Sequence, residues 1–584
     1  MTSPLRLSVV IATHNRWKVL AQTLPAVLAQ DFPPNAYEVI VVVDGSTDRT
    51  SEWLFNLSPL GTLRILEQSN CGQAAAQNAG LKAARGELVL FLDDDILCEA
   101  NLLQEHSAAH QAGESLAIFG PVLVAANSSN TLATDWVRSC TDEYLRRLAV
   151  DSEPQWPQDM LVDANVSAPR AVLLACGGFD ERFVGARDNA DFGMRLWKAG
   201  VRFRYLPSAV ARQIYVKTSR ELVRKDAPRY GRNEVHLCRK HPDYRPYSAL
   251  ASVGRGPRWR RWLRELAARS PVSPELLLRA PCAVAEWLRS IPWMRRAGVR
   301  MLQWQQGIEV LRSARCEVGS WEAFQAEFGR RLPVLLYHHV GPPRPGTYPE
   351  LTISPEKFER QIRWLARHGY VGVPPSAWLA WCREGRALPV RPVLLTFDDA
   401  YADLTEHALP VLRRYGFSAA VFVVTGQIGG TNAWDEKLGS ATHRLMTAEQ
   451  IRYWAGQGIE FGAHSRSHAD LRALHGSDLT EEVTGSGRDL AELLGTRVLS
   501  FAYPYGTHNV AVRKQVGSSF ALAFGIEEGL NCLQTDLYLL RRTMVQPDDS
   551  LSDFACRVRL GWSPVQRFRA RVVHAIRRPR GQEQ

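Results

Sequence analysis

Short apolar runs recur along the chain and alternate with longer amphipathic stretches. Residues 7–12 (LSVVIA) and 38–43 (EVIVVV) each contain a single polar residue, which is the pattern of a parallel strand buried on both faces. The stretch between them, residues 17–30, has the spacing of a helix. Strand, helix and strand form a β-α-β unit, so residues 1–242 are expected to fold as an α/β domain around a parallel sheet.

The same alternation returns in the last part of the chain. Residues 334–337, 393–397 and 419–424 are apolar runs of strand length, and helical stretches separate them. We therefore expect a second α/β domain with its own hydrophobic core over residues 332–560.

The segment between these two domains has a different pattern. Residues 243–331 are rich in Arg, Trp, Leu and Pro and contain no strand-like run. Trp259, Trp262 and Leu266 recur at helical spacing among basic residues, which predicts a basic amphipathic helix. We interpret this segment as a helical basic linker, and residues 561–584 as a basic tail.

Composition places the chain among globular proteins, with 45% hydrophobic and 22% charged residues. No run of about 18 apolar residues occurs, so we expect no transmembrane helix. The first residues lack a basic leader, an apolar core and a cleavage site, so secretion through a signal peptide is not expected. The ten cysteines are scattered singly, which favours a reducing, cytoplasmic location over a disulfide framework.

The net charge of +11 is concentrated in two segments. Residues 251–300 contain eleven Arg and three Glu, and residues 561–584 contain six Arg and one Glu. This distribution argues against nucleic-acid binding by the whole protein and favours local contact with an anionic partner. Arg combined with Trp suits an anionic membrane surface, so we expect either peripheral contact with the inner face of the membrane or a linker whose Trp side chains pack inward.

Acidic residues follow two of the predicted strands in the first domain. Asp44 follows the run 38–43, and Asp93, Asp94 and Asp95 follow the run 87–92. Carboxylates at the carboxyl end of parallel strands are placed to meet a ligand, and oxygen ligands suit Mg²⁺ or Mn²⁺, which can bridge to a diphosphate. Taken alone, each cluster also fits an ordinary Asp-rich turn.

Five separated motifs in this region occur in an order that resembles glycosyltransferase family 2. They are residues 10–16 (VIATHNR), 43–48 (VDGSTD), 70–80 (NCGQAAAQNAG), 91–95 (FLDDD), and 177–181 (GGFDE) followed by 191–196 (DFGMRL). The resemblance implies the GT-A fold and a nucleotide-sugar donor, with a glycan or lipid-linked saccharide as acceptor.

The same resemblance implies roles for single residues. Thr13 and Asp44 would contact the nucleotide, and Asp93 and Asp95 would hold the divalent metal on the diphosphate. An inverting transfer also needs a base for the acceptor hydroxyl. The usual position of that base falls on Asn189 here, so Asp188 is the first candidate and Asp191 the second.

A second chemical cluster lies in the last domain. Asp398 and Asp399 follow the run 393–397, and His464 and His468 are four residues apart. Two imidazoles and one carboxylate leave an open position for water, as a catalytic zinc site requires, while the second carboxylate can act as base. Two histidines at this spacing also fit one exposed face of a helix.

These residues belong to motifs that resemble polysaccharide deacetylases, carbohydrate esterase family 4. The motifs are residues 336–340 (LYHHV), 396–399 (TFDD), 464–468 (HSRSH) and 502–506 (AYPYG). The resemblance implies a distorted (β/α) barrel of about seven repeats. It also implies Asp398 as the base, with Asp399, His464 and His468 as ligands of Zn²⁺ or a similar ion. The backbone near Tyr505 would stabilise the oxyanion.

Two features of the family pattern are missing. Residues 500–504 (SFAYP) contain no Arg to orient the base, and residues 539–544 (LLRRTM) contain no His to act as general acid. His338 or His339, at the end of the first strand, is expected near the site, and the proton donor stays unassigned.

The main hypothesis is therefore a bifunctional carbohydrate enzyme that transfers a sugar and removes an acetyl group from an acetamido sugar. One alternative keeps an active glycosyltransferase and makes the barrel an inactive carbohydrate-binding module. A second alternative is a membrane-surface scaffold without catalysis.

Overall fold

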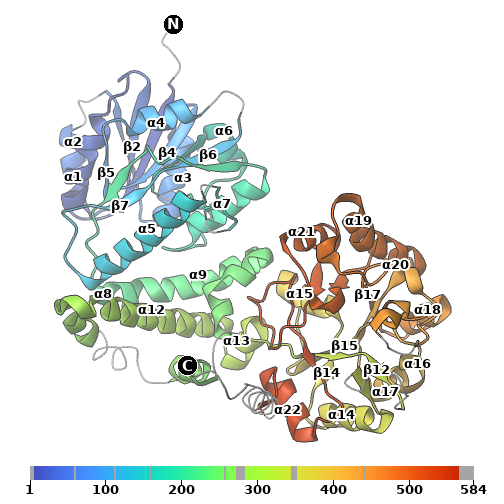
Figure 1. The fold of residues 1–584 in the computed structure, drawn as a ribbon. Helices are drawn as coiled ribbons and strands as arrows, with labels where there is room; N and C mark the ends of the chain where they lie inside the picture. The colour runs from blue at the N-terminus through green and yellow to red at the C-terminus, as the bar shows by residue number, and fades with distance from the viewer. Residues whose placement is uncertain are drawn as a thin grey trace, which may run out of the picture. The chain divides into compact units, whose positions relative to one another are not determined.

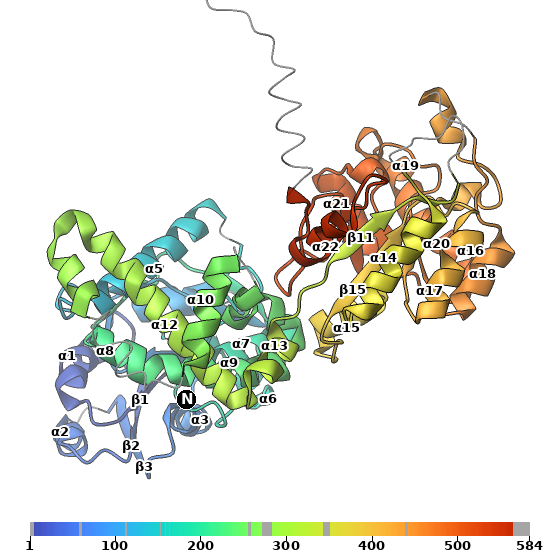
Figure 2. The same cartoon turned by 90° about the horizontal axis from the view of Figure 1, so that it is seen from below.

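The chain folds into two compact units. The computed structural model describes residues 5–57, 61–110, 114–151, 153–157, 159–162, 164–254, 258–270, 283–342, 351–438 and 442–564. One unit consists of residues 1–240 with 258–321, and the other of residues 241–257 with 322–584 (Figures 1 and 2). The residues of the predicted linker are thus divided between the two units. Residues 565–584 of the predicted tail lie outside the described residues.

A seven-stranded sheet forms the centre of the first unit, in the order β3-β2-β1-β4-β8-β6-β9. β1, β2, β3 and β4 are parallel, and β8 runs antiparallel to both β4 and β6. The strands are β1 (Leu7–Thr13), β2 (Tyr37–Asp44), β3 (Leu63–Gln68), β4 (Leu88–Asp93), β6 (Leu116–Phe119), β8 (Val166–Pro169) and β9 (Arg202–Tyr205). A second sheet joins β5 (Ile96–Cys98), β10 (Ala211–Gln213) and β7 (Val122–Val124).

Helices cover both faces of this sheet, which explains why its strands are apolar throughout. On one face, Leu7, Val9 and Ile11 pack with helices α1 (Trp17–Leu28), α2 (Thr50–Leu57) and α4 (Leu102–Ala109). On the other, Val10 packs with α3 (Gln73–Ala83), α6 (Arg170–Ala175) and α7 (Asp188–Lys198). Gly80 lets α3 approach β1 closely, because a Cβ there would lie 2.3 Å from a methyl carbon of Val10.

A layer of helices completes the first unit. α9 (Ala227–Lys240) packs along α12 (Arg295–Val318), which also contacts α5 (Leu132–Val150) and α10 (Arg258–Arg269) (Figure 2). The side chain of Trp259, part of the predicted amphipathic stripe, lies outside the described residues. None of the helices in the described part of the chain combines the length and apolar character needed to cross a membrane.

The second unit contains one curled sheet of eight parallel strands, in the order β19-β18-β17-β16-β15-β11-β20 with β14 beside β15 (Figure 1). The strands are β11 (Val334–Tyr337), β14 (Val371–Gly372), β15 (Pro392–Phe397), β16 (Ala420–Val423), β17 (Glu460–Ala463), β18 (Ser500–Ala502), β19 (Leu522–Phe524) and β20 (Thr543–Met544). The surrounding helices include α14 (Pro355–Arg367), α15 (Pro375–Glu384), α17 (Leu409–Tyr415), α18 (Ala448–Gly456), α20 (Ser486–Leu494), α21 (Val510–Ser519) and α22 (Leu551–Leu560). Strands and helices share one core.

The predicted strands are confirmed in both units. The runs 7–12, 38–43, 334–337, 393–397 and 419–424 correspond to β1, β2, β11, β15 and β16, with limits that agree within one residue. The predicted helix over residues 17–30 is α1, which ends at Leu28. The predicted fold classes are confirmed too: an α/β domain around a mainly parallel sheet comes first, and a curled parallel sheet surrounded by helices comes last.

Candidate active sites

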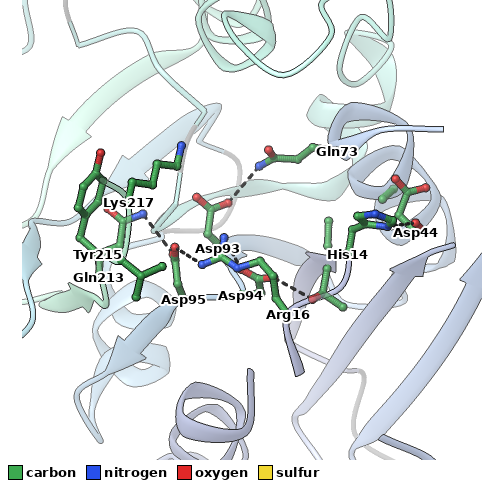
Figure 3. A pocket seen from close by; sticks show the side chains of 14 residues that line it. His14, Arg16, Asp44, Gln73, Asp93, Asp94, Asp95, Gln213, Tyr215 and Lys217 are labelled. Carbon is green, nitrogen blue, oxygen red and sulfur yellow. Dashed lines mark hydrogen bonds and ion pairs between the residues drawn. The ribbon is translucent and has the colours of Figure 1, made fainter. Parts of the chain in front are cut away.

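In the first unit, three neighbouring strands end at the same edge of the sheet. Thr13 of β1 is paired with Val43 of β2, and Ala12 is paired with Asp93 of β4. Thr13, Asp44, Asp93 and Asp95 therefore line one pocket of about 310 Å³, as predicted for the carboxyl ends of parallel strands (Figure 3).

Asp44 shapes one side of this pocket. Its carboxylate accepts hydrogen bonds from the backbone N–H groups of Cys71 (2.8 Å) and Gly72 (2.9 Å) and from the amide of Gln68 (2.8 Å). These contacts hold the loop that enters α3. The carbonyl oxygen of Asp44 also lies 2.6 Å from Nδ1 of His14, a second residue of the pocket lining.

The acidic triplet that follows β4 is partly neutralised by Arg16. The guanidinium lies 3.3 Å from Asp94 and 2.8 Å from Asp95, while the Thr13 hydroxyl donates to Asp94 at 2.7 Å (Figure 3). Burial, together with the charge of Asp95, raises the pKa of Asp94 to about 6 against the opposing effect of Arg16. Asp93 is the most accessible of the three and accepts from Gln73 at 3.2 Å.

The chemistry of this pocket fits a cation that is shared with a substrate. Asp93 and Asp95 offer carboxylate oxygens to the pocket, but Arg16 and Gln213 already contact Asp95. Mg²⁺ and similar ions are commonly held by one or two carboxylates together with substrate phosphates. The donor set therefore suits a metal that arrives with a diphosphate rather than one caged by protein alone.

The two candidate bases for the transfer lie on α7, and neither belongs to the lining of the described pocket. Asp188 begins the helix, directly after Arg187, whose backbone is left-handed with φ 70°. Asp191 is completely buried, and its two oxygens are ion-paired with Arg195 (2.9 Å) and Lys240 (2.7 Å). This double pairing gives Asp191 a role in holding α7.

In the second unit, residues that follow two strands converge on one point. Asp399 follows β15, and His464 and His468 follow β17. The Asp399 Oδ1 atom lies 3.6 Å from Nε2 of His464 and 3.4 Å from Nε2 of His468. Within the described residues, these three side chains are the one group of metal-ligating type whose ligand atoms all lie within 4.8 Å of one another.

Several features of this group fit a divalent cation. Oδ1 of Asp399 is buried and accepts no hydrogen bond. Nδ1 of His464 lies 2.8 Å from the carbonyl oxygen of Ala502, so that nitrogen carries the proton and Nε2 keeps its lone pair for a metal. Burial lowers the pKa of His464 and His468 and raises that of Asp399, whose neighbour Asp398 adds to the rise. A cation at this point would restore the charge of Asp399.

The backbone around this group is held in an uncommon conformation. Asp399, Ala400, Ser465, His468 and Tyr505 all have positive φ values, between 55° and 68°, although none is glycine. Each such residue costs about 1 kcal/mol or more and persists where the surrounding structure demands it, most often at functional sites.

Asp398 is fixed by an arginine that the sequence analysis missed. Arg542, immediately before β20, donates two parallel hydrogen bonds to the carboxylate, at 2.6 and 2.9 Å. Its Nε donates to the carbonyl oxygen of Gly525 at 2.8 Å, and its guanidinium lies over the ring of Phe422. Burial alone would raise the pKa of Asp398, but Arg542 and His464 outweigh it and hold the value at about 2. Asp398 is therefore ionised.

The only sequence signal for this arginine is its presence in residues 539–544, the stretch in which the deacetylase pattern has a histidine. β20 pairs with β11, and this long-range pairing carries Arg542 to the strand ends of the site. Arg542 thus makes the contact with the base that was expected from an arginine near residues 500–504.

The two histidines at the end of β11 differ in their surroundings. β11 and β15 are parallel, Tyr337 is paired with Phe397, and the N–H of Asp398 donates to the Tyr337 carbonyl oxygen at 3.1 Å. His338 therefore lies beside Asp398 and is partly accessible. His339 is buried, and its Nδ1 lies 2.7 Å from Asp403.

Two aromatic rings flank the metal-ligating group. The ring of Trp434 is stacked against His468 with centroids 4.8 Å apart, and Tyr505 meets the same imidazole edge-on at 4.5 Å. Tyr505 is 45% exposed and therefore lies at the rim of the site. Rings in this position offer apolar faces to a sugar, and an indole N–H or phenol O–H adds a polar contact.

Comparison with known proteins finds a family match in each unit. Residues 8–154 match the family described as glycosyl transferase family 2, and residues 385–520 match the family described as polysaccharide deacetylase. The chain therefore carries a glycosyltransferase family 2 domain followed by a polysaccharide deacetylase domain.

Three relatives illustrate the match. Validoxylamine A glucosyltransferase of Streptomyces hygroscopicus subsp. limoneus is 27% identical over 278 residues, 43% of this chain and 60% of that protein. Poly-beta-1,6-N-acetyl-D-glucosamine N-deacetylase of Staphylococcus aureus (strain MRSA252) is 25% identical over 211 residues, 34% of this chain and 69% of that protein. The structure of the mannosyltransferase PcManGT from Pyrobaculum calidifontis, in complex with GDP-Man and Mn²⁺, is 21% identical, covers 53% of this chain and 88% of that one, and has a TM-score of 0.37.

Proposed function

We propose that this protein is a bifunctional carbohydrate enzyme. One unit transfers a sugar from a nucleotide-sugar donor to a glycan or lipid-linked acceptor, and the other hydrolyses the acetamido group of an N-acetylated sugar. The observation that carries the second activity is the ionised Asp398, held by Arg542 next to the convergent Asp399, His464 and His468. A carbohydrate-binding module has no need of an oriented base beside a metal site.

In the deacetylation, Asp399, His464 and His468 would hold Zn²⁺ or a similar ion, which supplies Lewis acidity and lowers the pKa of water. Asp398 takes a proton from the attacking water, and Arg542 keeps the carboxylate oriented for that transfer. A backbone N–H near Tyr505 stabilises the oxyanion of the tetrahedral intermediate. His338 lies beside Asp398 at the ends of paired strands, but burial lowers its pKa to about 4, so it is not assigned as the donor of the proton to the departing amine.

In the transfer reaction, Thr13 and Asp44 bind the nucleotide part of the donor, and Asp93 and Asp95 would hold Mg²⁺ or Mn²⁺ on its diphosphate. That ion neutralises charge on the leaving diphosphate when it is bound. Asp188, the first candidate from the sequence motif, takes the proton from the acceptor hydroxyl. Asp191, whose two oxygens are ion-paired with Arg195 and Lys240, holds α7 in place.

We further propose that both reactions occur in the cytoplasm, with the protein held peripherally at the inner face of the membrane and without nucleic acid as a partner. A reducing compartment is supported by the cysteines, since all nine in the described residues are free thiols. The two reactions act in series if the transferred sugar is an N-acetylhexosamine.

The proposal is tested by donor choice and acetate release in one preparation. The full-length protein is given Mn²⁺ and a panel of nucleotide sugars, and free nucleotide is measured. Acetate release is then followed on the product and on N-acetylated oligosaccharides. We expect release of both, and loss of acetate release alone in Asp398→Asn.

A matched control for this variant is Asp549→Asn, because Asp549 is equally buried and is paired with Arg557 in the same unit. Acetate release that persists unchanged in Asp398→Asn would refute the assignment of the base. Nucleotide release without any acetate release from the wild-type protein would favour the carbohydrate-binding alternative.

A further inference from the structure

Helix α10 turns its apolar stripe toward solvent. Trp262 is 59% exposed, and Leu263 and Leu266 on the same side are also exposed. Among the described side chains of this helix, residues 261–269, the buried one is the small Ala268, and Glu265 accepts a hydrogen bond from the indole of Trp321 at 3.0 Å. A helix that packed Trp262 against a catalytic domain would show the opposite arrangement at this residue.

Three more tryptophans are exposed further along the same helical layer. Trp287 is 61% exposed and Trp293 is 82% exposed, while Trp304 on α12 is about half exposed. Isolated exposed apolar side chains are ordinary, but four exposed indoles within some forty residues form a concentration that marks an interaction surface.

Arginine side chains surround these indoles. Arg296 and Arg300 are exposed on α12, and neither makes an ion pair within the described residues. Arg300 lies one turn from Trp304, on the same side of the helix. By contrast, Arg289 and Arg295 are neutralised by Asp135 of α5. The two exposed arginines of α12 that make no ion pair in the described part of the chain, Arg296 and Arg300, therefore lie on the same side of this helix as Trp304.

This part of the molecule adjoins the wall of the sugar pocket. Ala285 and Leu302 pack with Tyr215 in one buried cluster, and Tyr215 is also part of the pocket lining. Two residues after the pocket-lining Lys217, the hydroxyl of Ser219 donates to Glu286 at 2.5 Å. Trp287 thus extends from the short helix that supports this wall.

We propose that Trp262, Trp287, Trp293, Trp304, Arg296 and Arg300 form a Trp/Arg surface that seats the first unit on an anionic lipid membrane. Indole rings prefer the boundary between headgroups and acyl chains, and arginines attract anionic headgroups. A surface that combines exposed Trp with exposed Arg therefore fits an anionic membrane better than it fits another protein. The proposed transferase activity gives this surface a use, because a lipid-linked acceptor would then meet the pocket at the membrane. The binding itself does not depend on that activity.

The test is sedimentation of the full-length protein with vesicles, without donor or acceptor. We expect binding to phosphatidylcholine mixed with phosphatidylglycerol at low salt, and weak binding to phosphatidylcholine alone or at high salt. Trp262→Ser, Trp287→Ser, Trp293→Ser and Trp304→Ser combined should weaken binding at least roughly ten-fold. Arg296→Glu with Arg300→Glu should weaken it by about ten-fold or more at low salt only.

Two matched controls separate this surface from general charge or stickiness. Arg367→Glu with Arg383→Glu makes the same change in net charge on exposed arginines of the second unit, and Phe55→Ala removes an exposed aromatic ring elsewhere in the first unit. Both should bind like the wild type, whereas Trp293→Ala alone should bind more weakly. Nucleotide release from a soluble donor, together with circular dichroism, reports on folding.

A wild-type protein that stays in the supernatant with anionic vesicles at low salt would overturn the proposal. So would equal losses of binding in the surface variants and in the controls. Self-association in the absence of vesicles that disappears in the four-tryptophan variant would assign the surface to a second copy of this chain instead.

Discussion

Both candidate sites set aspartates against an arginine, but at very different depths. Arg16, whose side chain is 34% exposed, is shared between Asp94 and Asp95 at the wall of an open pocket. Arg542 is completely buried and gives both of its terminal nitrogens to a single carboxylate, that of Asp398. The first arrangement can be rearranged by a charged ligand at low cost, and the second cannot.

This difference corresponds to the two kinds of chemistry. A nucleotide diphosphate brings its own charges, and a site that shares a cation with it is completed only when the donor binds. Hydrolysis of an amide needs a base, metal ligands and an oxyanion site that are already in place, because reorganisation during the reaction would raise the barrier. The left-handed residues around Asp399 and His468 are consistent with such an arrangement set in advance.

The largest expected effect comes from separating the two sites by crossed variants. Asp398→Asn should lower acetate release by roughly 10²- to 10⁴-fold, the usual contribution of a general base, and leave nucleotide release unchanged. Asp93→Asn should do the reverse. Measuring both products for both variants checks this, and a variant that impairs both reactions equally would show that the sites are not independent.

The second largest expected difference between the two sites is how firmly each retains its metal ion. After dialysis into metal-free buffer without chelator, nucleotide release should require added Mn²⁺ or Mg²⁺, whereas acetate release should persist. Three protein ligands would hold a zinc-type ion in the second unit, but only two carboxylates would hold the ion on a diphosphate in the first. Metal analysis of the dialysed protein should find about one ion per chain, and His464→Ala should remove it. An ion retained by His464→Ala would contradict the assignment.

Breaking the buried pair should show what Arg542 adds beyond stability. Arg542→Met and Arg557→Met each leave a buried aspartate without its partner, so both should lose about 3–5 kcal/mol in the free energy of unfolding of the second unit. Only Arg542→Met should move the acidic limb of the pH profile for acetate release to higher pH, because burial then raises the pKa of Asp398 against the weaker opposition of His464. Identical pH profiles for wild type and Arg542→Met would reduce the arginine to a structural role.

The smallest expected effect concerns two buried histidines of the first unit. Burial lowers the pKa of His106 and His110 to about 4, and both rings contact the hydroxyl of Ser167. In the unfolded chain these two histidines bind protons below pH about 6.5, whereas in the folded unit they stay neutral down to pH about 4. The free energy of unfolding of the first unit should therefore fall as the pH drops from about 6.5 to about 4, by up to roughly 1.4 kcal/mol per pH unit for each histidine.

His106→Gln should therefore lower stability at neutral pH and flatten the dependence on pH. Chemical denaturation of the full chain at several pH values measures both, with His368→Gln in the second unit as a control for the substitution. An unchanged slope in His106→Gln would show that this histidine does not couple folding to protons.

The sequence alone was enough to predict the strands, the order of the domains and the residues that end each strand. Wholly apolar runs such as residues 38–43 form parallel strands because both faces of the sheet are covered, and a residue that follows such a strand must lie at the sheet edge. For this reason Thr13, Asp44 and Asp93 share a pocket, and Asp398, Asp399 and His464 share a site.

Tertiary structure decided what depends on contacts between residues far apart in the chain. Arg542 reaches Asp398, 144 positions away, only because β20 pairs with β11. Asp191 is ion-paired with Lys240 of α9, and Trp262 of α10 is exposed whereas Ala268 of the same helix is buried. A local pattern records which side chains share a face, but the partner of that face is set by long-range packing, which spacing along the chain does not encode.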